Sequence, residues 1–172
     1  ESPLPALAFT QPTVDVTARS LPTNYVQGVF AAPALNNPDY HAMRVAVSIL
    51  ATRVYTEVRV KNNLSYAPGA EMNNMSANSA NISVSSGDAN RSISLMLNEI
   101  RKLKTQPIDR SDILETAGFF LTSYYMKQET NAAQAAELAT YELIGGGWRN
   151  STEFLNRIRQ VTPADVQRVA QT

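Results

Sequence analysis

Hydrophobic and polar residues alternate in several short runs of the first half of the chain, as they do in strands that bury one face. The alternation covers residues 14–18, and a more apolar run follows at 25–32. Two further runs of the same kind, 64–72 and 80–86, are separated by a stretch rich in Asn and Ser. This order predicts two hairpin-like pairs of antiparallel strands.

A helical period governs the segment between these pairs and most of the chain after them. In Asn37-Pro38-Asp39, asparagine can cap a helix, proline suits its first position and aspartate complements its dipole. Apolar residues then recur every three or four positions to about Lys61, where Asn62 and Asn63 tolerate the left-handed backbone that ends a helix. Further helices are predicted after Gly87-Asp88, Asp109, Thr130, Ser151 and Thr162.

The order of these elements predicts an α+β fold, in which an antiparallel β-sheet has helices packed on one face and the C-terminal half is helical. Residues 1–12 hold three prolines and little periodicity, which indicates a linker or an extended arm. Residues 13–172 are then a single domain, long enough to bury a core.

Composition removes several classes of function. Fifteen basic residues balance fifteen acidic ones, so no basic surface is predicted for nucleic acid or an anionic membrane. No apolar run is long enough to span a bilayer. Cysteine is absent, which excludes disulfides and thiolate nucleophiles. The chain starts at Glu1 without a signal-like segment and ends in a helical pattern, so we expect a piece of a longer protein.

Arg59 and Tyr66 are the candidate functional residues. Arg59 lies in the last turn of the predicted helix 37–61, and Tyr66 lies at the start of the next predicted strand. Side chains placed in this way on a helix and a returning strand can point into one space. The simpler alternative is that Arg59 complements the helix dipole and Tyr66 packs in the sheet.

The passage Glu57-Val58-Arg59-Val60-Lys61-Asn62-Asn63-Leu64-Ser65-Tyr66 resembles the arginine–tyrosine signature in the C-terminal half of pitrilysin/insulinase-type zinc peptidases, the inverzincins, which include mitochondrial processing peptidases. The order of elements over residues 14–172 is also similar to one domain of that family. The resemblance implies that Arg59 anchors the substrate backbone and that Tyr66 stabilises the tetrahedral intermediate. Where the family commonly has glycine after the helix, this chain has Asn63.

The zinc-binding H-x-x-E-H helix of the family is not in this sequence. A catalytic zinc needs about three protein ligands, and the chain offers one histidine, His41, and no cysteine. We therefore expect no metal site and no autonomous active site here, and interpret His41 as a surface or partly buried residue without a role. The resemblance implies zinc on a partner domain or subunit, an extended peptide substrate, and a periplasmic or exported location.

Two other functions stay open. Some proteins of this fold are non-catalytic structural or assembly subunits, for which the arginine–tyrosine pair would have no use. A general peptide-binding module is the third possibility. In any of these cases the face meant for a partner gives the isolated domain a reason to form a homodimer.

Overall fold

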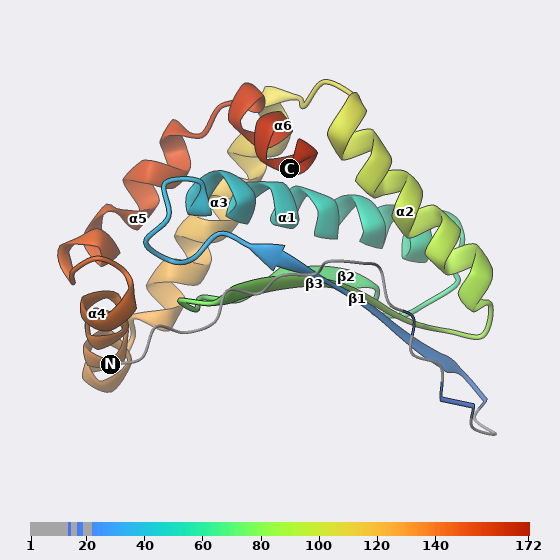
Figure 1. Ribbon diagram of the computed structural model, residues 1–172, viewed down its shortest axis with the longest axis horizontal. Helices are drawn as coiled ribbons and strands as arrows, with labels where there is room; N and C mark the ends of the chain where they lie inside the picture. The colour runs from blue at the N-terminus through green and yellow to red at the C-terminus, as the bar shows by residue number, and fades with distance from the viewer. Residues whose placement is uncertain (1–13, 15–16, 19–21) are drawn as a thin grey trace.

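The computed structural model describes residue 14, residues 17–18 and residues 22–172. Within this part of the chain the order of elements is one strand, a long helix, two strands and five further helices, as Figure 1 shows. The predicted arm 1–12 and residues 15–16 of the predicted strand 14–18 lie outside the described residues. Residues 14, 17 and 18 are described, and they are not part of a strand. The α+β class and the helical C-terminal half are confirmed.

The sheet has three antiparallel strands, β1 (Asn24–Ala32), β2 (Gly69–Met72) and β3 (Asn78–Ser86), in the order β1-β3-β2. Burial alternates strictly along β3, whose even-numbered residues are buried. These residues face the helices, because Figure 1 places the described helices on one side of the sheet. The other face presents neutral polar residues of β3, namely Ser79, Asn81, Ser83 and Ser85.

Strand β2 is shorter than the predicted strand 64–72, because residues 64–68 form a bend instead. The backbone N–H of Leu64 donates to the carbonyl of Val58 in the preceding helix at 3.0 Å, and Pro68 has no N–H to give to a sheet. Tyr66 therefore lies in this bend before the strand, which corrects its predicted place on the strand.

The long predicted helix 37–61 consists of α1 (Tyr40–Val54), which continues directly into the π-helical segment η1 (Tyr55–Lys61). Asn37 lies just before α1, and the side-chain oxygen of Asn37 accepts a hydrogen bond from the N–H of Asp39 at 2.8 Å. Asn63 follows the end with a φ of 50°, the left-handed conformation expected of it.

Five helices make up the second half. They are α2 (Ala89–Thr105), α3 (Arg110–Lys127), α4 (Asn131–Ile144), α5 (Arg149–Gln160) and α6 (Pro163–Gln171). The predicted caps Asp88, Asp109, Thr130 and Thr162 each accept a hydrogen bond from the first turn of their helix. Ser151 instead lies inside α5, where its side chain donates to Glu137 at 2.5 Å.

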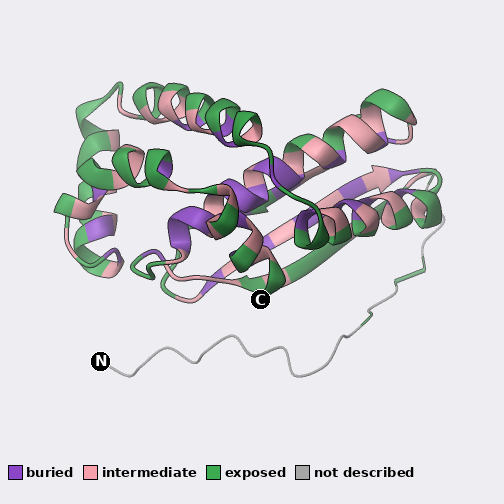
Figure 2. Ribbon diagram, turned by 90° about the horizontal axis from the view of Figure 1, so that it is seen from above, coloured by how far each residue is buried: buried purple, intermediate pink, exposed green. Residues whose placement is uncertain are grey.

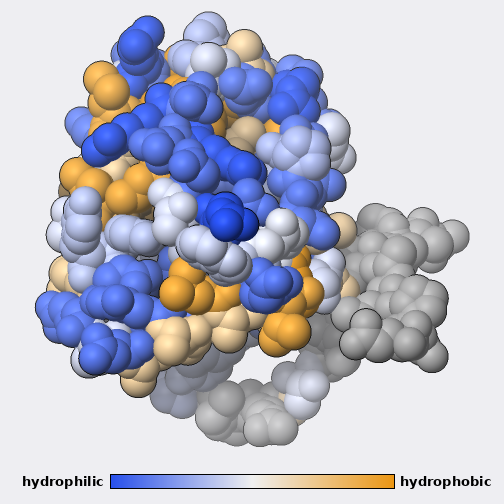
Figure 3. All heavy atoms as spheres, turned by 90° about the vertical axis from the view of Figure 1, so that its left-hand side faces the viewer, coloured by the Kyte–Doolittle hydropathy of each residue, from blue (hydrophilic) through white to orange (hydrophobic). Residues whose placement is uncertain are grey.

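The core lies between α1 and the elements around it, and Figure 2 shows the buried residues concentrated along α1. Its most buried large side chains include Tyr40, Val54, Ile158 and Val166. Figure 3 shows the side of the molecule that carries α4, where apolar side chains are scattered among hydrophilic ones. None of the helices that the structure describes has the length and hydrophobicity to cross a bilayer.

Candidate functional site: an arginine over an exposed tyrosine

The structure brings Arg59 and Tyr66 together at the corner between η1 and the bend before β2. The guanidinium carbon of Arg59 lies 5.0 Å from the centre of the Tyr66 ring, within the range of a cation–π contact. Arg59 is half-buried, whereas Tyr66 is 80% exposed. The phenol of Tyr66 is therefore accessible to another molecule, while the guanidinium of Arg59 contacts its ring.

Local hydrogen bonds fix the position of Arg59. Its Nη1 donates to the side-chain oxygen of Asn63 at 2.9 Å, and the backbone N–H of Asn63 donates to the carbonyl of Arg59 at 3.1 Å. Asn63 holds this place because asparagine adopts left-handed geometry more readily than most residues. A guanidinium has five N–H donors, so this contact leaves most of its donors for a ligand.

Two buried serines, Ser86 and Ser92, fix the bend at residues 64–68 through hydrogen bonds on its inner side. The hydroxyl of Ser86, at the end of β3, donates to the carbonyl of Leu64 at 2.9 Å. Ser86 also accepts hydrogen bonds from the backbone N–H of Asp88 at 3.2 Å and from the hydroxyl of Ser92 at 2.9 Å. Ser86 and Ser92 are 2% and 0% exposed. The start of α2 and the end of β3 thus fix the backbone two residues before Tyr66.

A charged contact completes this support. Arg91 in the first turn of α2 donates to the side-chain oxygen of Asn62 at 2.8 Å, and Asn62 donates to the carbonyl of Glu57 at 2.8 Å. Sequence reasoning missed Ser86 and Arg91. The available signal was the inward register of β3, in which Ala80, Ile82 and Val84 are followed by a hydroxyl.

His41 is buried in α1, at 8% exposure, rather than on the surface. Its ring lies 5.2 Å from that of Tyr40 and 5.7 Å from that of Phe154, centre to centre. Burial, with a smaller effect from the charge of Arg157, lowers the pKa of His41 to about 4. Its Nε2 is buried without a hydrogen-bond partner among the described residues.

The residues that the structure describes do not fit a zinc site. Among residues 14, 17–18 and 22–172, no three His, Asp or Glu side chains are grouped closely enough to hold a metal ion. The chemistry available at the corner is that of donors, namely a fixed cation and an exposed phenol. Such groups bind carbonyl oxygens, and they bind more strongly as negative charge develops on the oxygen.

Solved structures of similar fold include proteases and a chain of complex III2. The inactive peptidase domain of a protein assigned as a zinc protease, from Bordetella parapertussis, is 20% identical; the alignment covers 90% of this chain and 86% of that one, with a TM-score of 0.77. A chain of complex III2 from Candida albicans is 16% identical over 90% of this chain and 40% of its own length, with a TM-score of 0.78. The periplasmic protease PqqL from Escherichia coli is 14% identical over 89% of this chain and 18% of its own length, with a TM-score of 0.73.

At these identities the structural comparisons show the fold alone. No curated protein sequence matches the chain. The family model described as the peptidase M16 inactive domain, however, matches residues 1–139, well over half of the sequence. The chain therefore belongs to the peptidase M16 family of pitrilysin-type zinc proteases, as an inactive domain of that family.

Proposed function

We propose that this domain is the substrate-holding half of a zinc metalloendopeptidase, and that Arg59 and Tyr66 act on a peptide cut at a zinc site on a partner domain or subunit. The observation that carries the proposal is the contact of the two side chains, 5.0 Å from guanidinium carbon to ring centre, with the phenol exposed. The alternative, in which Arg59 complements the helix dipole and Tyr66 packs in the sheet, does not account for a contact between the two side chains at the surface.

The two residues have different roles. Arg59 presents a planar set of donors beside the phenol, and these bind a backbone carbonyl of an extended peptide. The hydroxyl of Tyr66 donates to the oxygen of the attacked carbonyl, whose negative charge grows in the transition state. The zinc on the partner supplies the Lewis acid and the activated water.

The arrangement around the pair suits catalysis because little has to move. Asn63 fixes the guanidinium, and Ser86 fixes the bend that carries Tyr66. Donors that are already in place when charge develops lower the barrier without a cost of reorganisation.

The partner is a domain or subunit with an H-x-x-E-H helix, and the substrate is an extended, unstructured peptide. A periplasmic or exported location fits this proposal, since PqqL is a periplasmic protease of the same fold. The alternative is a structural subunit, which the chain of complex III2 illustrates. The retention of both Arg59 and Tyr66 favours the peptidase.

The test is cleavage of an unstructured peptide by this domain mixed with its zinc-bearing partner. Tyr66→Phe removes one hydroxyl and keeps the ring under Arg59, and we expect it to lower kcat about a hundredfold. Arg59→Lys keeps the charge but loses the planar fork, so it should also raise KM. The matched control is Tyr25→Phe, which removes the hydroxyl of a residue of β1 that is 76% exposed. If Tyr66→Phe cleaves as fast as Tyr25→Phe, the structural subunit is the better interpretation.

A further inference from the structure

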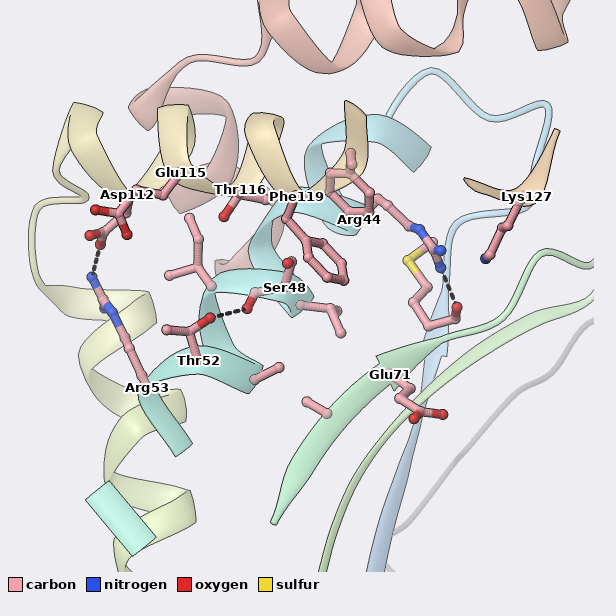
Figure 4. Close-up of a pocket in the computed structure, with 16 residues that line it drawn as sticks. Arg44, Ser48, Thr52, Arg53, Glu71, Asp112, Glu115, Thr116, Phe119 and Lys127 are labelled. Carbon is pink, nitrogen blue, oxygen red and sulfur yellow. Dashed lines mark hydrogen bonds and ion pairs between the residues drawn. The ribbon is translucent and has the colours of Figure 1, made fainter. Parts of the chain in front are cut away.

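A second candidate site lies away from the Arg59–Tyr66 corner, in a cavity of about 700 Å³ between α1, α3 and β2. Figure 4 shows the side chains around it. A neighbouring cavity of about 510 Å³ lies between α1, α3 and α4. Arg44, Lys127 and the aromatic residues Phe119 and Phe120 line both cavities, so these four residues mark the junction between them.

Arg44 is a cation without a counter-ion at this junction. Its Nη1 donates to the backbone carbonyl of Met72, and its guanidinium carbon lies 5.6 Å from the centre of the Phe120 ring. Its Nε is buried and has no hydrogen-bond partner among the described residues. No described carboxylate lies within ion-pair distance of it. The half-buried guanidinium thus has one backbone acceptor and one ring contact but no negative charge to balance it, so an anion in the cavity would supply the missing counter-ion.

Another arginine of the same cavity shows the contrast. Arg53 lies at the other end of the cavity of about 700 Å³ and forms an ion pair with Asp112 at 2.8 Å, as Figure 4 shows. Arg53 therefore has a counter-ion within the domain, whereas Arg44 has none among the described residues.

Lys127, the last residue of α3, adds a second positive charge. Figure 4 shows its ammonium group on the same side of the cavity as the guanidinium of Arg44.

Of the acidic residues of this cavity, Glu71 points to the other side of β2, and Glu115 lies beside Asp112 at the far end. Glu137 lines the neighbouring cavity and accepts a hydrogen bond from Ser151 at 2.5 Å. The junction is thus positively charged, with aromatic walls.

The edge of β2 runs beside these cations. β2 is the outer strand of the described sheet, and the N–H of Asn73 donates to the carbonyl of Ser79 at 3.0 Å. Hydrogen-bonded positions alternate along an antiparallel pair, so the backbone groups of Ala70 and Met72 face away from β3. Arg44 already binds the carbonyl of Met72, which leaves the other groups for an extended chain.

We propose that Arg44 and Lys127 form a carboxylate-binding subsite for an extended peptide that lies along β2. A guanidinium and an ammonium side by side match a carboxylate, and charge-assisted hydrogen bonds to it are among the stronger ones in proteins. The carboxylate is either the C-terminal group of the peptide or an acidic side chain. The subsite stands apart from the proposed cleavage function, because neither Arg59 nor Tyr66 lines either cavity.

The test uses this chain alone and three fluorescein-labelled versions of one short peptide of Ala, Ser and Leu. The first has a free C-terminal carboxylate, the second is amidated, and the third is amidated with one internal Glu. Fluorescence anisotropy should show that the first or the third binds about tenfold or more tightly than the second, and which of them does so identifies the source of the carboxylate.

The variants assign the effect to the two cations. Arg44→Met and Lys127→Met should each remove most of the preference for the carboxylate. Lys127 is exposed at a helix end, so its replacement leaves the fold intact even if Arg44→Met unfolds the domain. The matched control is Arg110→Met, which removes a cation from the first turn of α3 outside both cavities and should keep the preference. Equal binding of all three peptides, or an unchanged preference in Lys127→Met, would overturn the proposal.

Discussion

Acidification below pH 6.5 should destabilise this domain through His41, the single histidine of the sequence. Its pKa is about 4 in the folded protein, against an ordinary value of about 6.5 in the unfolded chain. Because the folded state holds the ring neutral, the unfolded state takes up the proton first. Stability is therefore complete above pH 6.5 and falls as the pH drops from 6.5 towards 4.

The size of the effect follows from the same two values. One bound proton changes the free energy of unfolding by about 1.4 kcal/mol per pH unit. Between pH 7 and pH 5 the expected loss is at most about 2 kcal/mol, since only the pH range below 6.5 contributes. This is a ceiling, because water that reaches the charged ring would raise its folded pKa. Carboxyl groups titrate mainly below this range, so the change belongs to His41.

Urea denaturation at pH 7 and pH 5 measures the loss, and His41→Phe is the control. A phenyl ring can keep the contacts with Tyr40 and Phe154 and carries no titratable group, so stability should change little with pH in that variant. A direct check is proton NMR, in which the single histidine gives one Cε1–H signal to titrate. A signal that titrates near pH 6.5 in the folded protein would refute the reasoning.

Two further predictions concern the bend that carries Tyr66. Ser86→Ala removes the partner of the Leu64 carbonyl inside the core and should lower the free energy of unfolding by about 1–3 kcal/mol. The control is Ser94→Ala, which removes an exposed hydroxyl bonded within its own helix and should lower the free energy of unfolding by less than about 0.5 kcal/mol. Equal losses of the two variants in urea denaturation would contradict the role of Ser86. Asn63→Gly should change the thermal midpoint of unfolding little, because glycine accepts the φ of 50°. Asn63→Val should lower the free energy of unfolding by about 1–2 kcal/mol. A valine variant as stable as the original protein would show that the bend is not held in that conformation.

Much of this fold could be predicted because local signals and tertiary structure agree. Strand β1 lies within one residue of its predicted run, and the caps Asp88, Asp109, Thr130 and Thr162 begin helices as their side chains indicate. The bend at 64–68 was mistaken for strand, because Leu64 and Tyr66 alternate as they would in a sheet. Part of what decides against a strand is local, since Leu64 bonds back to Val58 and Pro68 has no N–H to donate. The rest is a hydrogen bond from Ser86, a residue 22 positions from Leu64, which the local pattern does not contain.

The candidate site was accessible from sequence only in part. The seven-residue spacing of Arg59 and Tyr66 drew attention to the pair, but the direct contact of the two depends on the angle of the bend. The supporting residues Ser86 and Arg91 and the unpaired Arg44 are separated in sequence from what they contact. Such contacts are set by packing, so the structure was needed to find them.

The π-helical segment η1 has a consequence for how this corner can evolve. In a π-helix each carbonyl bonds five residues ahead instead of four, so the turn is wider and the residues after it are rotated compared with an α-helix. Arg59 lies inside this segment. Deleting any single residue between Tyr55 and Val58 would return the segment to the tighter winding and turn the guanidinium away from the phenol, although both side chains would still be present. Relatives that keep both residues but lose the wide turn would therefore hold the two groups in a sequence alignment without holding them in space.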